Sequence, residues 1–208
     1  MKQNLKKISG VVIAAGVLLL IGAAILFGIT TADESRAADS VQRIVDRLVE
    51  VTLKDLNTSQ TGEKDIPNSE STEEKESAEP VIEIDGTPYL GYLSFTGYDL
   101  TLPVIADWSF DALQYAPARF SGTVEGNDLV IAAHNYFSHF YLLNNMVEGN
   151  EVILTLADGT EIRYIVQKTE TLSPIALNDL TAGDYDLTLF TCTPTGLARA
   201  TVRCGRIN

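Results

Sequence analysis

The sequence of 208 residues carries a formal net charge of −13 at pH 7 and is 45% hydrophobic. This length allows one domain of moderate size together with accessory segments. Residues 81–208 contain 15 acidic and 6 basic residues, which gives this part a net charge of −9 when histidine is neutral. A protein that binds nucleic acid needs a basic face, so the charge excludes nucleic acid as a partner.

Residues 1–32 predict a cytoplasmic tip followed by a transmembrane signal-anchor. Lys2, Lys6 and Lys7 precede residues 8–32, which contain no charged side chain. A bilayer core needs about 20 apolar residues, so this run is long enough to span one. The basic residues on its N-terminal side place that end in the cytoplasm and the rest of the chain outside. A cleaved signal peptide is the alternative, but its apolar region would be shorter, about 7–15 residues.

Two segments separate the predicted anchor from the globular domain. Residues 33–56 predict an amphipathic juxtamembrane helix, because apolar residues from Val41 to Val51 recur at three- and four-residue spacing. Such a helix either packs on the following domain or on another chain, as a stalk or regulatory arm, or lies loosely over its own domain or the membrane surface. Two heptads are too few for a coiled coil, so we expect the loose arrangement. Residues 57–80 are polar and acidic, which predicts a flexible linker.

The globular domain is expected to comprise residues 81–208. Short strand-like runs broken by glycine and proline dominate it, and helices are predicted only near residues 107–115 and 136–145. The clearest hairpin joins residues 151–156 to residues 160–168 through an Asp-Gly turn. Strands do not alternate with long helices. This pattern predicts an all-β fold, a closed antiparallel β-barrel with short helices.

The last stretch, residues 186–207, reads DLTLFTCTPTGLARATVRCGRI and predicts a second hairpin. Its Thr-Pro-Thr-Gly segment supplies the turn. If the strands pair across this loop, Cys192 and Arg199 face each other with Cβ atoms about 4.5–5.5 Å apart. A guanidinium in that place favours the thiolate or stabilises an oxyanion. The competing interpretation is that Cys192 is a small buried hydrophobe.

Two further arginines, Arg203 and Arg206, compete with Arg199 for this role. Arg203 has the same strand parity as Arg199, but it lies about 13 Å further from the loop along the strand. Arg199 is therefore the better candidate.

Cys204 is the second cysteine of the chain. In the predicted register it faces Leu187 and lies too far from Cys192 for a disulfide. We therefore expect two free thiols. The two cysteines and two histidines show no spacing typical of a metal site.

The chain offers two histidines, His134 and His139, as a base. His134 follows an apolar strand-like run, residues 129–133, and a Cys–His pair can activate a sulfur nucleophile and protonate a leaving amine. His139 lies five residues later, off the strand tip, and is the weaker candidate. Asn135 is a candidate to orient the imidazole, although solvent exposure explains an asparagine there equally well.

The segment TLFTC, residues 188–192, resembles the TLxTC signature of the sortases, cysteine transpeptidases of Gram-positive cell surfaces. Arg199 and His134, in the segment AAHN, lie where the active-site arginine and histidine of that family are expected. The resemblance extends from GYLSFTGYDLTLPV, residues 91–104, to the end of the chain. It implies a sortase-type β-barrel whose catalytic residues are His134, Cys192 and Arg199, and which needs no cofactor.

The resemblance also implies a two-step reaction. Cys192 attacks the threonine carbonyl of a sorting motif of the LPxTG or NPxTN type, and an amine then resolves the thioester. The implied partners are surface proteins or pilins with such a motif, an amine of a peptidoglycan precursor or pilin, and the membrane. Some sortases bind calcium through carboxylates. Asp107, Asp111 and Glu125 are candidates, but ordinary surface charge explains them better.

The class within the family stays open. A His-Asn pair and the absence of a DPF/DPW-type lid, which Asp107-Trp108 resembles only faintly, depart from the pilin-polymerising pattern. The short spacing between Cys192 and Arg199 is unlike the longer loops of housekeeping members. Two alternatives come from other classes: an L,D-transpeptidase, whose SHGC context is absent, and a non-catalytic anchored extracellular binding domain with a structural Cys192.

Overall fold

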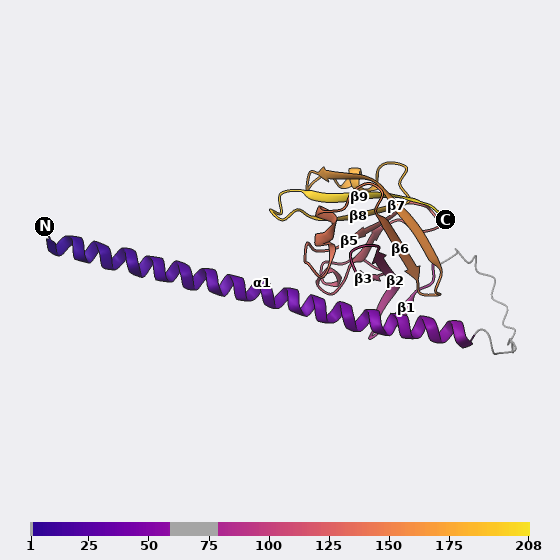
Figure 1. Cartoon of the computed structure of the whole chain (residues 1–208), viewed down its shortest axis with the longest axis horizontal. Helices are drawn as coiled ribbons and strands as arrows, with labels where there is room; N and C mark the ends of the chain where they lie inside the picture. Colours follow the sequence, from indigo (N-terminus) through magenta and orange to yellow (C-terminus); the bar gives the residue numbers. More distant parts are fainter. Residues whose placement is uncertain (1, 59–78) are drawn as a thin grey trace. The chain divides into compact units, whose positions relative to one another are not determined.

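The structure, a computed structural model, describes residues 2–58 and 79–208. The chain divides into two compact units, Met1–Arg36 and Ala37–Asn208, and each is described by itself. Helix α1 contributes to both units, and every described strand lies in the second (Figure 1). The elements are α1 (Lys2–Thr58), β1 (Ile82–Ile84), β2 (Thr87–Phe95), β3 (Leu100–Ile105), η1 (Ala112–Gln114), β4 (Ala118–Ser121), β5 (Leu129–Ala132), η2 (Phe140–Asn144), β6 (Glu151–Leu156), β7 (Glu161–Leu172), α2 (Leu177–Thr181), β8 (Leu187–Cys192) and β9 (Arg199–Arg206).

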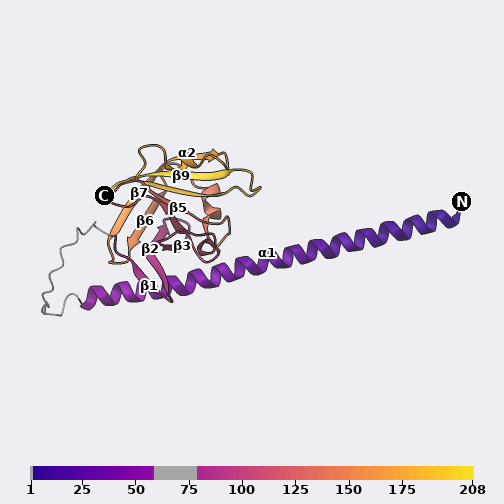
Figure 2. The same ribbon diagram turned by 180° about the vertical axis from the view of Figure 1, so that it is seen from behind.

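Eight of the strands form a closed barrel in the order β2-β3-β4-β5-β8-β9-β7-β6, and β6 pairs with β2 to close it. Strand β1 pairs with the first residues of β2, outside the closed ring (Figures 1 and 2). The predicted all-β barrel with short helices is confirmed. The hairpin expected around the Asp-Gly turn is β6–β7.

The barrel is not purely antiparallel, and in this respect the prediction was wrong. Strands β5 and β8 are parallel over four pairs, from Leu129↔Leu187 to Ala132↔Phe190, and β3 and β4 share one parallel pair. Parallel neighbours need a crossover connection. The chain supplies it between β5 and β8 with residues 133–186, which include the whole β6–β7 hairpin.

Both faces of β5 and β8 are buried, which explains why these strands read as continuous apolar runs. Successive side chains point to opposite faces of a strand. One set joins the inner cluster that fills the barrel: Leu129, Ile131, Leu187 and Leu189. The other set joins an outer cluster: Val130, Ala132 and Phe190, together with Leu48 of α1, Leu113 of η1 and Leu180 of α2.

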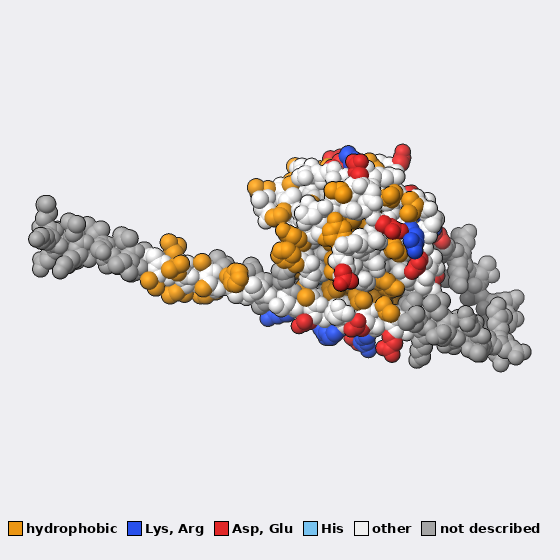
Figure 3. Space-filling view, in the orientation of Figure 1, with side chains coloured by type: hydrophobic (Ala, Val, Ile, Leu, Met, Phe, Trp, Pro, Cys, Tyr) orange, Lys and Arg blue, Asp and Glu red, His pale blue; other side chains and the backbone are white. Residues whose placement is uncertain are grey.

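The first unit is the N-terminal part of α1. Its described side chains between residues 16 and 27 are mostly apolar and exposed, as Figure 3 shows. A search of the described residues finds no helical segment with the length and hydropathy of a membrane span. The signal-anchor expected at residues 8–32 thus stays a prediction. Most of the expected linker, residues 59–78, lies outside the described residues.

In the second unit, α1 packs on the barrel, contrary to the loose arrangement expected from the sequence. Its buried stripe consists of Ala37, Val41, Val45 and Leu48. The spacing of four, four and three residues places them on one helix face. Beside this stripe, the Ser40 hydroxyl donates to the Tyr115 carbonyl at 2.9 Å. The apolar periodicity thus marks a core element of the domain.

Figure 3 shows one face of the molecule, on which the described Lys and Arg side chains are few and interspersed with Asp and Glu. This face therefore has no continuous basic patch among its described residues.

We predict that Leu48→Ala destabilises the full chain by about 2–5 kcal/mol, because it removes a buried side chain and leaves a cavity. Leu48 is 1% exposed. The fluorescence of Trp108, the single tryptophan, reports unfolding of the barrel in a denaturant titration of the full chain. The control is Gln42→Ala on the exposed face of the same helix, which should change stability by less than about 0.5 kcal/mol. Equal stability of the two variants would contradict the packing of α1.

Candidate active site

The parallel pairing of β5 and β8 brings His134 and Cys192 to one end of the barrel. The last pair of the ladder is Ala132↔Phe190, and His134 and Cys192 each follow two residues later on adjacent strands. Two hydrogen bonds extend the ladder past this pair: Ala133 N–H to the Phe190 carbonyl at 3.3 Å, and the Thr191 hydroxyl to the Ala133 carbonyl at 2.8 Å. Adjacent strands lie about 4.8 Å apart.

By the alternation of side chains, which for His134 is continued two residues past the end of β5, His134 and Cys192 fall on one face. Each has the parity of its outward-facing neighbour, Ala132 or Phe190, both of which belong to the outer cluster. Both His134 and Cys192 are partly exposed. The site therefore lies where the outer covering of the strands ends, and a substrate can reach it.

The antiparallel hairpin β8–β9 adds Arg199. Cys192 and Arg199 are directly paired, as the sequence predicted. Past this pair, Thr193 N–H donates to the Ala198 carbonyl at 2.9 Å, and Gly196 N–H donates to the Thr193 carbonyl at 2.8 Å. Gly196 has φ +72°, a conformation that glycine adopts at little cost. The turn thus fixes the register that sets Arg199 beside the thiol.

The surroundings of Arg199 and Arg203 distinguish these two candidates, and the third candidate, Arg206, lies at the other end of β9. Arg199 is partly exposed, and its Nη1 donates to the Ala198 carbonyl at 3.4 Å. Among the described residues, no carboxylate lies within ion-pair distance of the Arg199 guanidinium. Arg203 is 3% exposed and pairs with Glu170 at 2.9 Å. Of these candidates, Arg199 is therefore the one whose guanidinium can face a developing negative charge beside Cys192.

Burial shapes the titration of both histidines. It lowers the pKa of His134, so this imidazole is neutral at neutral pH and can accept a proton. His139 is 0% exposed, and burial together with the charge of His134 lowers its pKa to about 4. A substrate therefore cannot reach His139, whereas it can reach His134. The Tyr136 ring lies between them, with its centroid 5.0 Å from that of His134 and 5.4 Å from that of His139.

Asn135 does not orient the imidazole in this structure. Its side-chain oxygen accepts a hydrogen bond from the Asn144 amide at 2.8 Å. This bond ties the segment after β5 to η2, so Asn135 has a local structural role.

Both cysteines are free, as predicted. Cys204 pairs with Leu187 and is 0% exposed, and burial raises its pKa to about 12. The part of the chain that the structure describes holds no group of three His, Cys, Asp or Glu side chains that could bind a metal ion.

A row of aromatic rings leads away from the thiol, and sequence reasoning missed it. Phe190, two residues before Cys192 on the same face, has its ring centroid 5.3 Å from that of Phe120 on β4. Phe120 lies 5.6 Å from Trp108, which lies 4.9 Å from the exposed Phe110. Strand alternation could have placed Phe190 on the same face as Cys192, but the rings that it contacts belong to distant segments of the chain and could not be predicted in this way.

Comparison with known proteins decides the family. Residues 94–206, more than half of the chain, match the Sortase family, described as "Sortase domain". The chain belongs to the sortase family. It is therefore a cysteine transpeptidase, and the resemblance of TLFTC to the sortase signature is confirmed.

Solved structures of sortases have the same fold. Sortase C1 from Streptococcus agalactiae is 27% identical, with a TM-score of 0.53 over 61% of this sortase and 71% of that chain. Sortase C from Streptococcus pneumoniae is also 27% identical, with a TM-score of 0.51 over 58% and 69%. A lid mutant of sortase A from Corynebacterium diphtheriae, 21% identical over 80% and 95% with a TM-score of 0.52, shows the fold alone. No curated protein matches the sequence significantly.

We predict that iodoacetamide modifies Cys192 and leaves Cys204 unmodified in the native sortase. Cys192 is partly exposed, whereas Cys204 is buried with its thiol held protonated. Mass mapping after alkylation without reductant should show both cysteines modified once the chain is denatured. A recovered peptide with a Cys192–Cys204 disulfide would contradict both the register and the assignment of Cys192 as nucleophile.

We also predict that protonation of His139 destabilises this sortase at acidic pH. The folded-state pKa of about 4 lies below that of an unfolded histidine. The contribution of the neutral, buried His139 to the free energy of unfolding is therefore fully present above about pH 6.5. It is lost as the pH falls towards 4. A shift of this size corresponds to about 3 kcal/mol.

His139→Gln isolates this effect from the titration of carboxylates. Denaturant unfolding at pH 6.5 and pH 4 should show a smaller loss of stability in the variant than in the wild type. An equal loss in both proteins would show that His139 does not titrate with a lowered pKa.

Proposed function

We propose that this sortase cleaves a C-terminal sorting motif of the LPxTG or NPxTN type and transfers the new acyl end to an amine. The observation that carries the proposal is the order of neighbouring strands β5-β8-β9, which sets His134, Cys192 and Arg199 side by side at one end of the barrel. Each of these side chains is partly exposed. A nucleophile, a base and a free cation thus meet on one face.

In the first step, the Cys192 thiol gives its proton to the neutral His134 imidazole, and the thiolate attacks the threonine carbonyl carbon of the motif. The Arg199 guanidinium donates to the oxyanion of the tetrahedral intermediate. The peptide C–N bond then breaks, and the departing amine takes the proton from the His134 imidazolium. The product is a thioester on Cys192, and His134 is neutral again.

In the second step, an acceptor amine attacks the thioester carbonyl. His134 takes a proton from the attacking nitrogen, and Arg199 again faces the oxyanion. The C–S bond breaks, and the Cys192 thiolate regains a proton from His134. The thioester exchanges for an amide without any external energy source.

A pilin lysine is the acceptor that the comparisons favour. The S. pneumoniae sortase C is described in terms of pilin substrate specificity, and it shares 27% identity with this chain. Pilins with a sorting motif are then the donor substrates as well. The amine of a peptidoglycan precursor is the alternative acceptor.

We predict that Cys192→Ala and His134→Ala each abolish acyl transfer without unfolding the barrel. Arg199→Ala should lower the rate by about 10²–10³, the effect of removing one oxyanion donor. Arg199→Lys should recover little, because a lysine keeps the charge but not the planar fork. The measurement is formation of the acyl-enzyme by mass spectrometry with a panel of LPxTG and NPxTN peptides, followed by transfer to a lysine-bearing peptide.

The matched control is Arg206→Ala, which removes an exposed cation at the other end of β9. It should retain full activity. If Arg199→Ala were fully active, another group would have to stabilise the oxyanion. If every peptide in the panel failed to form an acyl-enzyme with the wild type, the proposed substrate class would be wrong.

We further propose that residues 8–32 anchor the chain in the cell membrane, with the barrel on the extracellular side. The uncharged sequence and the preceding lysines support this topology. Protease treatment of intact Gram-positive cells that express the full chain should cut the chain between residues 59 and 80. Because α1 packs on the barrel, the barrel fragment is recovered and mapped after denaturation. Absence of a cut in this range, or cleavage only within residues 81–208, would contradict the topology.

A further inference from the structure

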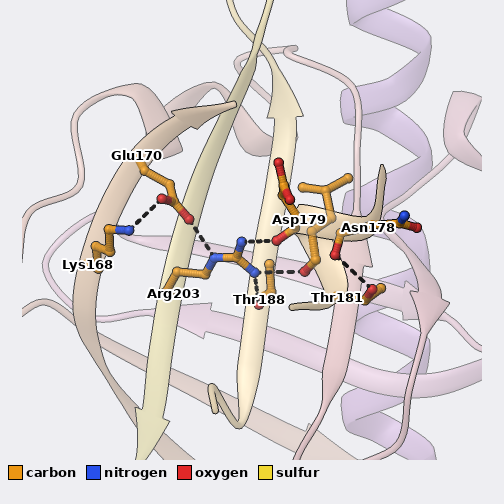
Figure 4. A network of polar contacts seen from close by, with 8 residues as sticks. Lys168, Glu170, Asn178, Asp179, Thr181, Thr188 and Arg203 are labelled. Atoms are coloured by element: carbon orange, nitrogen blue, oxygen red, sulfur yellow. Dashed lines mark hydrogen bonds and ion pairs between the residues drawn. The ribbon is translucent and has the colours of Figure 1, made fainter. Parts of the chain in front are cut away.

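The Arg203 guanidinium makes more hydrogen bonds than an ion pair with one carboxylate would require. It is 3% exposed, and its guanidinium contacts three elements. Nε donates to Glu170 of β7 at 2.9 Å, and Nη1 donates to the Thr188 hydroxyl of β8 at 3.0 Å. Nη1 also donates to the Leu180 carbonyl at 2.7 Å, and Nη2 donates to the Asp179 carbonyl. Figure 4 shows this fan of contacts between β7, β8 and α2.

The two carbonyls belong to the last turn of α2. A helix of five residues is too short to be stable alone in water. The last carbonyls of a helix lack partners within it, and a cation is favourable at that end. Arg203 satisfies two of these carbonyls at once. A planar guanidinium can do this, whereas a lysine ammonium in the same place lacks the fork.

The carboxylate of Glu170 completes the network. The Lys168 ammonium also donates to it, at 2.6 Å. Burial raises the pKa of Glu170, but the hydrogen bonds and charges of Lys168 and Arg203 together lower it further than burial raises it. The carboxylate therefore stays ionised and balances the buried guanidinium.

This network lies on the face of the sheet that carries the nucleophile. Thr188↔Arg203 and Cys192↔Arg199 are pairs of the same two strands with the same parity, about 13 Å apart along the strands. Phe190 lies between them on that face. Leu180 of α2 is 1% exposed and belongs to the same outer cluster as Phe190. Helix α2 therefore covers the strip of β8 that ends at Cys192.

We propose that Arg203 is a positioning residue, which holds α2 against β8 as a wall beside which the substrate peptide lies when it reaches Cys192. This proposal rests on the proposed function, because it assigns α2 a role in binding the sorting peptide. Arg203 itself does not touch the reacting atoms. Its loss should weaken peptide binding and leave the chemistry of Cys192 intact.

The test is Arg203→Lys in the full chain, with the sorting peptide that best acylates the wild type. KM for that peptide should rise by about fivefold or more, while kcat stays within about twofold. Alkylation of Cys192 by iodoacetamide should keep its wild-type rate, because this small reagent reaches the thiol without binding beside α2. Amide hydrogen exchange should become faster in residues 177–186.

Lys168→Ala is the matched control. Lys168 donates to the same Glu170 carboxylate, but its side chain is 49% exposed and makes no contact with α2 among the described hydrogen bonds. It should change KM by less than about twofold. If Arg203→Lys does not fold, Leu180→Ala loosens α2 with Arg203 in place and should give the same rise in KM.

Faster exchange in α2 without a change in KM would overturn the proposal, because α2 would then not border the peptide. A loss of kcat and of Cys192 alkylation at constant KM would overturn it too, since Arg203 would then act on the thiol. Failure of the proposed function gives a different result, a wild type that forms no acyl-enzyme with any sorting peptide. That result would overturn both.

Discussion

The site depends on the parallel pairing of β5 and β8. Both strands end at the same edge, so Cys192, the last residue of β8, and His134, two residues past the end of β5, come to the same end of the barrel. If β5 and β8 ran antiparallel, His134 would lie near Leu187, about 17 Å from Cys192 along the strand. The long crossover of residues 133–186 is therefore a condition of the chemistry, and the β6–β7 hairpin within it also closes the barrel.

The burial of β5 and β8 on both faces explains why the candidate site lies at the ends of these strands. Inside the barrel, β5 and β8 pack on the inner cluster, and outside they are covered by α1, η1 and α2 through Leu48, Leu113 and Leu180. The covering stops at the strand ends. There the side chains are partly exposed, and partial burial lowers the pKa of His134. Cys192 is thus reachable from solvent without being surrounded by it.

Local features were predictable from the sequence, and non-local ones were not. The Cys192↔Arg199 pair follows from the turn residues between the two strands, because a short loop fixes the register of a hairpin. The direction of β8 relative to β5 has no such local signal, so the antiparallel prediction failed. Similarly, the periodicity of α1 revealed an apolar stripe but not the barrel that covers it. The burial of Arg203 depends on α2, a five-residue helix that was not predicted from the sequence.

The two arginines of β9 show how environment assigns function to identical side chains. Arg199 and Arg203 lie on one face, four residues apart, and each carries a permanent charge. The donors of Arg203 are directed to a carboxylate, a hydroxyl and two carbonyls, so none of its charge is available to a substrate. Arg199 has one long hydrogen bond to a neighbouring carbonyl. A guanidinium stabilises an oxyanion only when its donors point to where that charge develops. The network that occupies Arg203 therefore also leaves Arg199 as the cation that can act at Cys192.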